Sequence, residues 1–136
     1  MRRHSLKQSI TIKIVWLMMV TAASGAYAQG RGQGSGNQTP IVEAVGCLSQ
    51  TGSEWILVNA TEAETVTSTF TTPEALKAAA GKSLGTQKYR LLGVKPFSPE
   101  PHIGHMMAAR GLLIKSSSDI RINVTSLQML AATCAK

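Results

Sequence analysis

Short runs of apolar residues, many of them alternating with polar ones, mark five segments between residues 41 and 130 as β-strands. The first two segments, "IVEAVGCLSQ" at 41–50 and "EWILVNA" at 54–60, flank the turn signal Thr51-Gly52-Ser53. Two β-rich segments joined by a short turn with a glycine are typical of a hairpin. We therefore expect these strands to pair directly.

Three further strands are predicted in the second half of the chain, over 87–94, 106–115 and 121–130. Gly111 in the middle of the fourth strand indicates a bend or bulge. In the fifth strand the apolar positions change phase near Thr125-Ser126, which a β-bulge would produce.

One helix is predicted, over 72–81. Thr72 suits the N-cap, Pro73 suits the first helical position, and Gly81 can end the helix with a positive φ. Leu76 and Ala80 would form its narrow apolar stripe, which we expect to pack on the surface of the strands.

Two segments have no strong pattern of their own. The stretch 65–72, "TVTSTFTT", fits either a short strand or an extended loop. In 95–105 the prolines Pro99 and Pro101 exclude a strand and leave room only for a helical turn.

The predicted order is strand, strand, helix, strand, helical turn, strand, strand. The fold class is thus mainly β, and a five-stranded OB-like barrel with one short inserted helix fits it best. A five-stranded SH3-like barrel and a β-sandwich fragment are the alternatives.

Residues 1–28 have the features of a cleaved signal peptide. Arg2, Arg3 and Lys7 precede the apolar run 14–20, and Ala26-Tyr27-Ala28 is an A-x-A cleavage signal. A retained N-terminal anchor is the alternative. "RRHSLK" also resembles a twin-arginine export motif with serine in place of phenylalanine, but the general secretory route is favoured.

The predicted mature chain has a linker followed by one domain. Residues 29–40 are rich in glycine and polar residues and predict a flexible, disordered linker. The OB-like domain is expected over 41–136, in a periplasmic or secreted protein without a membrane span.

Charge argues against a nucleic-acid partner. The chain has a formal net charge of +7, but ten basic and seven acidic residues remain after residue 28, a net charge of +3. These charges are scattered, and no basic stripe with stacking aromatic residues is present.

The sequence contains two cysteines, Cys47 and Cys134, near the two ends of the predicted domain. An even pair in an exported chain favours a disulfide, and the absence of a C-x-x-C motif speaks against a redox role. Two free thiols are the alternative.

Several motifs resemble those of a group of small, exported, mostly uncharacterised bacterial proteins with OB-like β-barrels. They are "GCL" at 46–48, "LGTQKYRLLGV" at 84–94, H-x-G-H at 102–105 before "GLLI", and "RINVTSLQMLAATC" at 121–134. The resemblance covers most of residues 41–134 and implies the fold, without implying an activity. It departs at Met106, Met107 and the "AAR" that follows, where the group has a regular alternating strand.

The strongest candidate for chemistry is the cluster His102, His105, Met106 and Met107. Imidazole and thioether are good copper ligands, and thioether is soft enough for Cu(I). If a strand begins at His105, the side chains alternate and no common ligand set forms. The histidine would then bond a loop carbonyl while the methionines fill the core.

Enzymatic motifs are absent from the sequence. No serine stands in a nucleophile motif, the carboxylates are spread out, and no phosphate-binding glycine loop is present. Trp55 is a candidate for ligand stacking on the barrel's open face, together with Tyr89 and Arg90 as binding residues, although small barrels also use tryptophan in the core.

These observations predict an exported, non-enzymatic small barrel with a binding or structural role in the cell envelope, whose partner is an envelope component or small ligand. No cofactor is expected. A periplasmic copper-binding protein and a small envelope enzyme are the alternatives.

Overall fold

The computed structural model describes residues 38–134 of the 136-residue chain and is mainly β. The predictions for 1–28 and for most of 29–40 lie outside the described residues. No helix within the described part has the length and apolar character needed to cross a membrane. Its elements are β1 Ile41–Thr51, β2 Glu54–Ala60, β3 Glu64–Thr65, α1 Pro73–Ala80, β4 Gln87–Leu92, the 3-10 helices η1 Lys95–Phe97 and η2 Glu100–His102, β5 Met106–Lys115 and β6 Ile120–Ala131.

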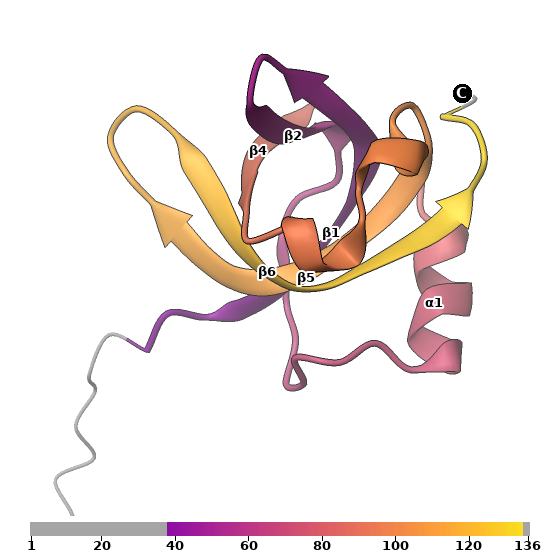
Figure 1. Cartoon of the computed structure of the whole chain (residues 1–136). Coiled ribbons are helices and arrows are strands. Elements are labelled where there is room, and N and C mark those ends of the chain that lie inside the picture. The colour runs from indigo at the N-terminus through magenta and orange to yellow at the C-terminus, as the bar shows by residue number, and fades with distance from the viewer. Residues whose placement is uncertain (1–37, 135–136) are drawn as a thin grey trace, which may run out of the picture. The chain divides into compact units, whose positions relative to one another are not determined.

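Five strands close into a ring (Figure 1). Strand β1 pairs with β2, β2 with β4, β4 with β6, β6 with β5, and β5 returns to β1. The contact between β4 and β6 is parallel and all the others are antiparallel. The two-residue strand β3 adds to β1 outside this ring. Because the ring is closed, the backbone N–H and C=O groups that would be unpaired at the edges of an open sheet form hydrogen bonds between strands.

The predicted hairpin is confirmed. Strands β1 and β2 pair from Thr51 opposite Glu54 to Cys47 opposite Val58. Gly52 has φ of +61° in the turn, a conformation that glycine adopts without steric cost. The turn chemistry thus fixes the register of the first pair.

The predicted bulge in the last strand is also confirmed. Arg110 pairs with Ser126, but the next residue, Gly111, pairs with Val124, so Thr125 is the extra residue. The bulge returns Leu127 to the same core cluster as Val124. The change of phase in the sequence therefore preserves one apolar face.

Gly111 lets the backbone of β6 approach β5. A Cβ built on Gly111 would lie 2.0 Å from the carbonyl oxygen of Asn123. We expect Gly111→Ala to lower the free energy of unfolding by about 2–3 kcal/mol, because the contact is with backbone and cannot be relieved by a side-chain rotation. Urea denaturation measures this loss. Gly52→Asn is the control, since nothing lies within 4 Å of that position and asparagine tolerates a left-handed φ. Equal costs for the two variants would contradict the explanation.

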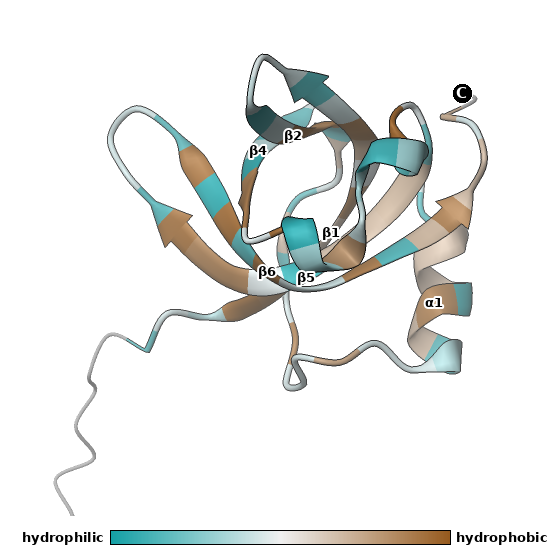
Figure 2. Ribbon diagram, in the orientation of Figure 1, coloured by the Kyte–Doolittle hydropathy of each residue, from teal (hydrophilic) through white to brown (hydrophobic). Residues whose placement is uncertain are grey.

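The core has two parts. The larger cluster joins residues of all five ring strands, including Leu48, Leu57, Tyr89, Met107 and Ile122. The smaller one is formed by Val45, Ala79, Met106 and Ala108, with Cys134 packed beside it. Residues 42–48 of β1 are buried without interruption because both faces of this strand are covered. Figure 2 colours each residue by its hydropathy and shows the apolar stretches along the strands.

Helix α1 begins as predicted and ends differently. The Thr72 side chain accepts a hydrogen bond from the Ala75 amide at 3.2 Å, as an N-cap does. The expected positive φ at Gly81 is wrong, because this residue has φ of −85°. The helix ends with hydrogen bonds from the Gly81 amide to the Ala78 carbonyl and from the Lys82 amide to the Ala79 carbonyl. Leu76 is half-buried, but the buried alanine is Ala79 rather than Ala80, so the second residue of the predicted apolar stripe is wrong.

The loops match the coarse prediction. Of the segment 65–72, only Thr65 lies in a strand, the two-residue β3, and the remainder up to α1 is a loop. The proline-rich segment contains η1 and η2 in place of a strand. The main helix follows the second ring strand, and only these 3-10 turns stand between the third and the fourth.

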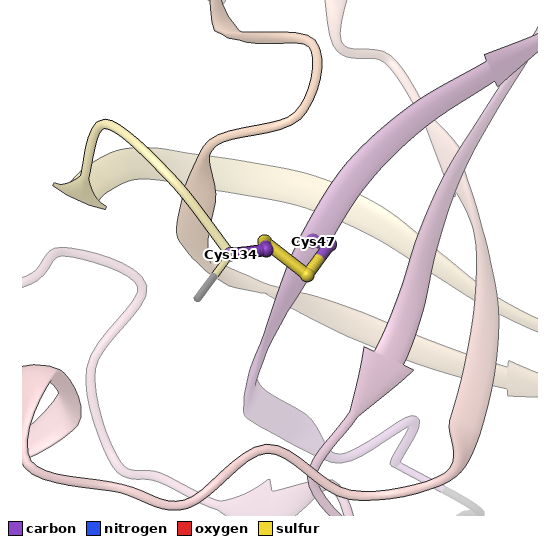
Figure 3. The surroundings of a disulfide bond; sticks show 2 residues. All are labelled: Cys47 and Cys134. Atoms are coloured by element: carbon purple, nitrogen blue, oxygen red, sulfur yellow. A yellow bond between two sulfur atoms is a disulfide. The ribbon is translucent and has the colours of Figure 1, made fainter. Parts of the chain in front are cut away.

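The predicted disulfide is present (Figure 3). Cys47 of β1 is bonded to Cys134, with the Cα atoms 5.8 Å apart across a sequence separation of 87. The bond connects the first strand of the ring to the segment that follows the last one. A cross-link between such distant positions excludes many unfolded conformations.

Candidate binding groove

A polar groove of about 510 Å³ lies over one side of the ring. It is built by β2, by β4 with the residue before it, and by the loop between β5 and β6 together with the first residue of β6. Its lining consists of Glu54, Ile56, Thr86, Gln87, Lys88, Arg90, Ser118, Asp119 and Ile120.

Arg90 is the central side chain of this groove. Its guanidinium donates to Glu54 of β2 and lies 3.4 Å from Asp119 of the β5–β6 loop. Asp119 in turn lies 3.4 Å from Arg121, so each carboxylate is held by a cation. The planar fork of arginine suits such contacts with two acids. The arrangement connects three segments that are far apart in the sequence.

The charges that line the groove balance. Lys88 and Arg90 are opposed by Glu54 and Asp119, while Ile56 and Ile120 supply the apolar surface. The site therefore offers both hydrogen-bond donors and acceptors and has no net charge from its lining. Such a lining can orient a polar uncharged molecule and offers no excess positive charge to a polyanion.

Of the three predicted ligand-binding residues, Arg90 lines this groove and the other two are largely buried. Trp55 is 7% exposed, belongs to the main core and only borders a neighbouring hollow. Tyr89 is 2% exposed and donates a hydrogen bond to the Thr61 carbonyl at 3.1 Å. Burial, reinforced by the negative charge of Glu62, raises the pKa of the Tyr89 hydroxyl.

A second hollow, of about 640 Å³, lies beside the disulfide. It is bordered by the segment 82–86, Asn59 at the end of β2, Met106 and Cys134. Asn59 has φ of +49°, at the place where the pairing of β2 with β4 shifts. This hollow contains one charged side chain, Lys82, and lacks the paired charges of the groove.

The predicted copper cluster is divided between different surroundings. The imidazoles of His102 and His105 meet, with their Nδ1 atoms 3.3 Å apart. Met106 is packed in the smaller core cluster and Met107 in the larger one. Among residues 38–134, no group of three or more His, Cys, Asp or Glu side chains is placed to hold a metal ion. Copper binding by the four residues stays a prediction.

A buried ion pair was not predicted. Glu43 of β1 and Arg110 of β5 face each other across the strand pair, each with 6% of its side chain exposed. Arg110 donates to Glu43 Oε2 at 2.5 Å from a terminal nitrogen and at 3.1 Å from Nε. The sequence does contain a signal for this pair, because Glu43 and Arg110 are charged residues within two otherwise apolar strands. A buried charge is stable only when it is paired with an opposite charge.

Arg110 also holds the loop before α1. It donates to the carbonyls of Ser68 and Phe70, while the Thr125 hydroxyl donates to the Thr69 carbonyl at 3.1 Å. The loop is therefore fixed over the outer face of β5 and β6. Phe70 itself remains 75% exposed.

The described part of the protein is thus a mainly β domain with five strands in a ring, one disulfide and a polar groove. No protein-family model matches the chain, and no curated protein matches it in sequence.

Proposed function

We propose that this is an exported, non-enzymatic protein whose OB-like barrel binds a small polar ligand of the cell envelope. The groove at Arg90 carries the proposal, because three separate segments contribute charged side chains to one neutral, concave surface. Sites with a few fixed polar groups and some apolar lining are typical of small-molecule binding.

The pairing order supports the OB-like assignment. In chain order the five ring strands pair 1-2-3-5-4-1, with the third and fifth parallel, as in OB-folds. These folds bind oligonucleotides and oligosaccharides over strands 2 and 3 and the loops beside them. The groove lies over the corresponding strands, β2 and β4, and the loop between the fourth and fifth strands.

The balance of charge favours a neutral ligand over a nucleic acid. Two cations and two carboxylates line the groove, so binding gains little from phosphate neutralisation. An uncharged oligosaccharide has hydroxyl groups that donate to Glu54 and Asp119 and accept from Lys88 and Gln87. We therefore assign neutral glycans as the ligand class.

The disulfide supports a location outside the cytoplasm. Structural disulfides persist in oxidising compartments, and the bond is compatible with a periplasmic or extracellular protein. Together with the signal sequence expected in 1–28, it supports export to the cell envelope. Intact-mass spectrometry tests the cleavage: the mass of a chain that begins at Gln29 is the expected result.

Binding to a glycan array tests the function. We expect the exported protein to bind neutral oligosaccharides, and Arg90→Ala to weaken this binding at least about tenfold, because removal of the guanidinium also releases Glu54 and Asp119. The ion pairs are partly exposed, so the variant should remain folded.

Lys77→Ala is the matched control, since Lys77 is an exposed cation on α1 away from the groove. Its binding should equal that of the unmodified protein. Binding confined to acidic glycans or to single-stranded DNA would contradict the proposal, as would equal binding by Arg90→Ala and the control.

A further inference from the structure

Two imidazole rings converge in the segment between β4 and β5. Nδ1 of His102 lies 3.3 Å from Nδ1 of His105, and the ring centroids are 5.4 Å apart in an edge-to-face arrangement. Both side chains are partly exposed, so the pair is accessible from solvent. It lies outside the groove at Arg90.

The backbone fixes this approach. The His105 amide donates to the His102 carbonyl at 3.0 Å, and the His102 amide donates to the Pro99 carbonyl at 2.9 Å. Gly104, between the histidines, has φ of +82°, which a glycine adopts without strain. The turn therefore presents both rings on a common side before any ligand is bound.

The same turn is attached to the rigid part of the domain. Leu48, next to Cys47, donates to the His105 carbonyl at 3.1 Å and accepts from Gly104 at 2.8 Å. The Cys134 amide donates to the Gly104 carbonyl at 3.2 Å. Hydrogen bonds thus join the histidine turn to the chain on both sides of the disulfide. These backbone hydrogen bonds keep the turn, and with it the two imidazole rings, in position.

The distance between the two nitrogens fits one coordination geometry well. For metal–nitrogen bonds of about 2.0–2.1 Å and a tetrahedral angle, two ligand nitrogens lie about 3.3–3.4 Å apart. We propose that His102 and His105 form a two-imidazole site for a tetrahedrally coordinated cation, Zn²⁺ or Cu⁺, with Nδ1 of each ring as the ligand atom. The remaining positions are open to water or to a small exogenous ligand.

The methionines and cysteines are not part of this site. Met106 and Met107 are buried in two different core clusters, and both cysteines of the chain are used in the disulfide. Neutral imidazole suits both Zn²⁺ and Cu⁺, so the pair needs no sulfur ligand. The proposal is independent of the glycan groove.

Separate titrations of the exported protein with Zn²⁺, and anaerobically with Cu⁺ against a chromophoric chelator, test the site. We expect the unmodified protein to bind one equivalent of Zn²⁺, of Cu⁺ or of each. His102→Gln and His105→Gln should each weaken this binding at least about tenfold. The two titrations show which cation is preferred. Replacement by Co²⁺ should give the intense visible absorption of a tetrahedral complex.

Met106→Leu is the matched control, because it keeps the packing beside the turn and removes a thioether. It should bind as the unmodified protein does. Circular dichroism and thermal melting check that each variant is folded. His102 is partly exposed and lies before the start of β5, so His102→Gln tests the site even if His105→Gln disturbs that strand. Absence of binding by either cation would overturn the site, as would binding unchanged in both histidine variants or lost in Met106→Leu.

Discussion

Removal of the Cys47–Cys134 bond should strongly lower the stability of the domain. For a separation of 87 residues, the loss of loop-closure entropy in the unfolded chain corresponds to about 4–5 kcal/mol as an upper value. We expect Cys47→Ala combined with Cys134→Ala to lower the free energy of unfolding by about 3–5 kcal/mol. For a domain of this size, the melting temperature should fall by roughly 15–30 °C.

Reduction of the unmodified protein provides the control. The reduced chain keeps both thiols and loses only the cross-link, so it should melt near the temperature of the double variant. A melting temperature that is unchanged on reduction would contradict a stabilising role. A fall seen only in the alanine variant would assign the loss to packing around Cys47, which is buried.

Arg110→Met should have the second largest effect. It removes the closer of the two cations at the buried Glu43 carboxylate and leaves the longer ion pair with Lys82, whose Nζ lies 3.9 Å from Glu43 Oε1. Breaking a buried pair by removing one partner costs about 3–5 kcal/mol, and the loop before α1 also loses the donor to its Ser68 and Phe70 carbonyls. Urea denaturation measures the loss of stability, and hydrogen exchange measures the loosening of the loop.

The double variant Glu43→Leu with Arg110→Met separates these contributions. Replacement of both charges by apolar side chains removes the buried carboxylate that has lost its closer cation, so most of the lost stability should return. The loop amides should still exchange faster, because their anchor is missing. A double variant as unstable as Arg110→Met would show that the ion pair is not the source of the loss.

Local features of the fold could be predicted from the sequence because their signals are local. Gly52 marks the hairpin turn, Thr72 marks the start of the helix, and the change of phase at Thr125 marks the bulge. Each depends on the conformational preference of one residue or on the periodicity of its neighbours. The disulfide followed from the number of cysteines and their expected compartment.

The order of the strands and the site could not be predicted in the same way. Glu54, Arg90 and Asp119 come together only through the pairing of β2 with β4 and the position of the β5–β6 loop. Side-chain direction in a strand reverses with a shift of one residue, so the half-buried Arg90 and the fully buried Tyr89 look equivalent in the sequence. The helix stripe at Ala80 was misplaced because helix contacts depend on packing.

The proposed binding of a neutral glycan in the groove around Arg90 can be measured by a nuclear magnetic resonance titration of the ¹⁵N-labelled protein with chitotriose. We expect the largest amide shifts to cluster at Glu54, at 86–90 and at 118–120, the segments that line the groove. No shifts at millimolar chitotriose, or shifts confined to other faces of the domain, would contradict it.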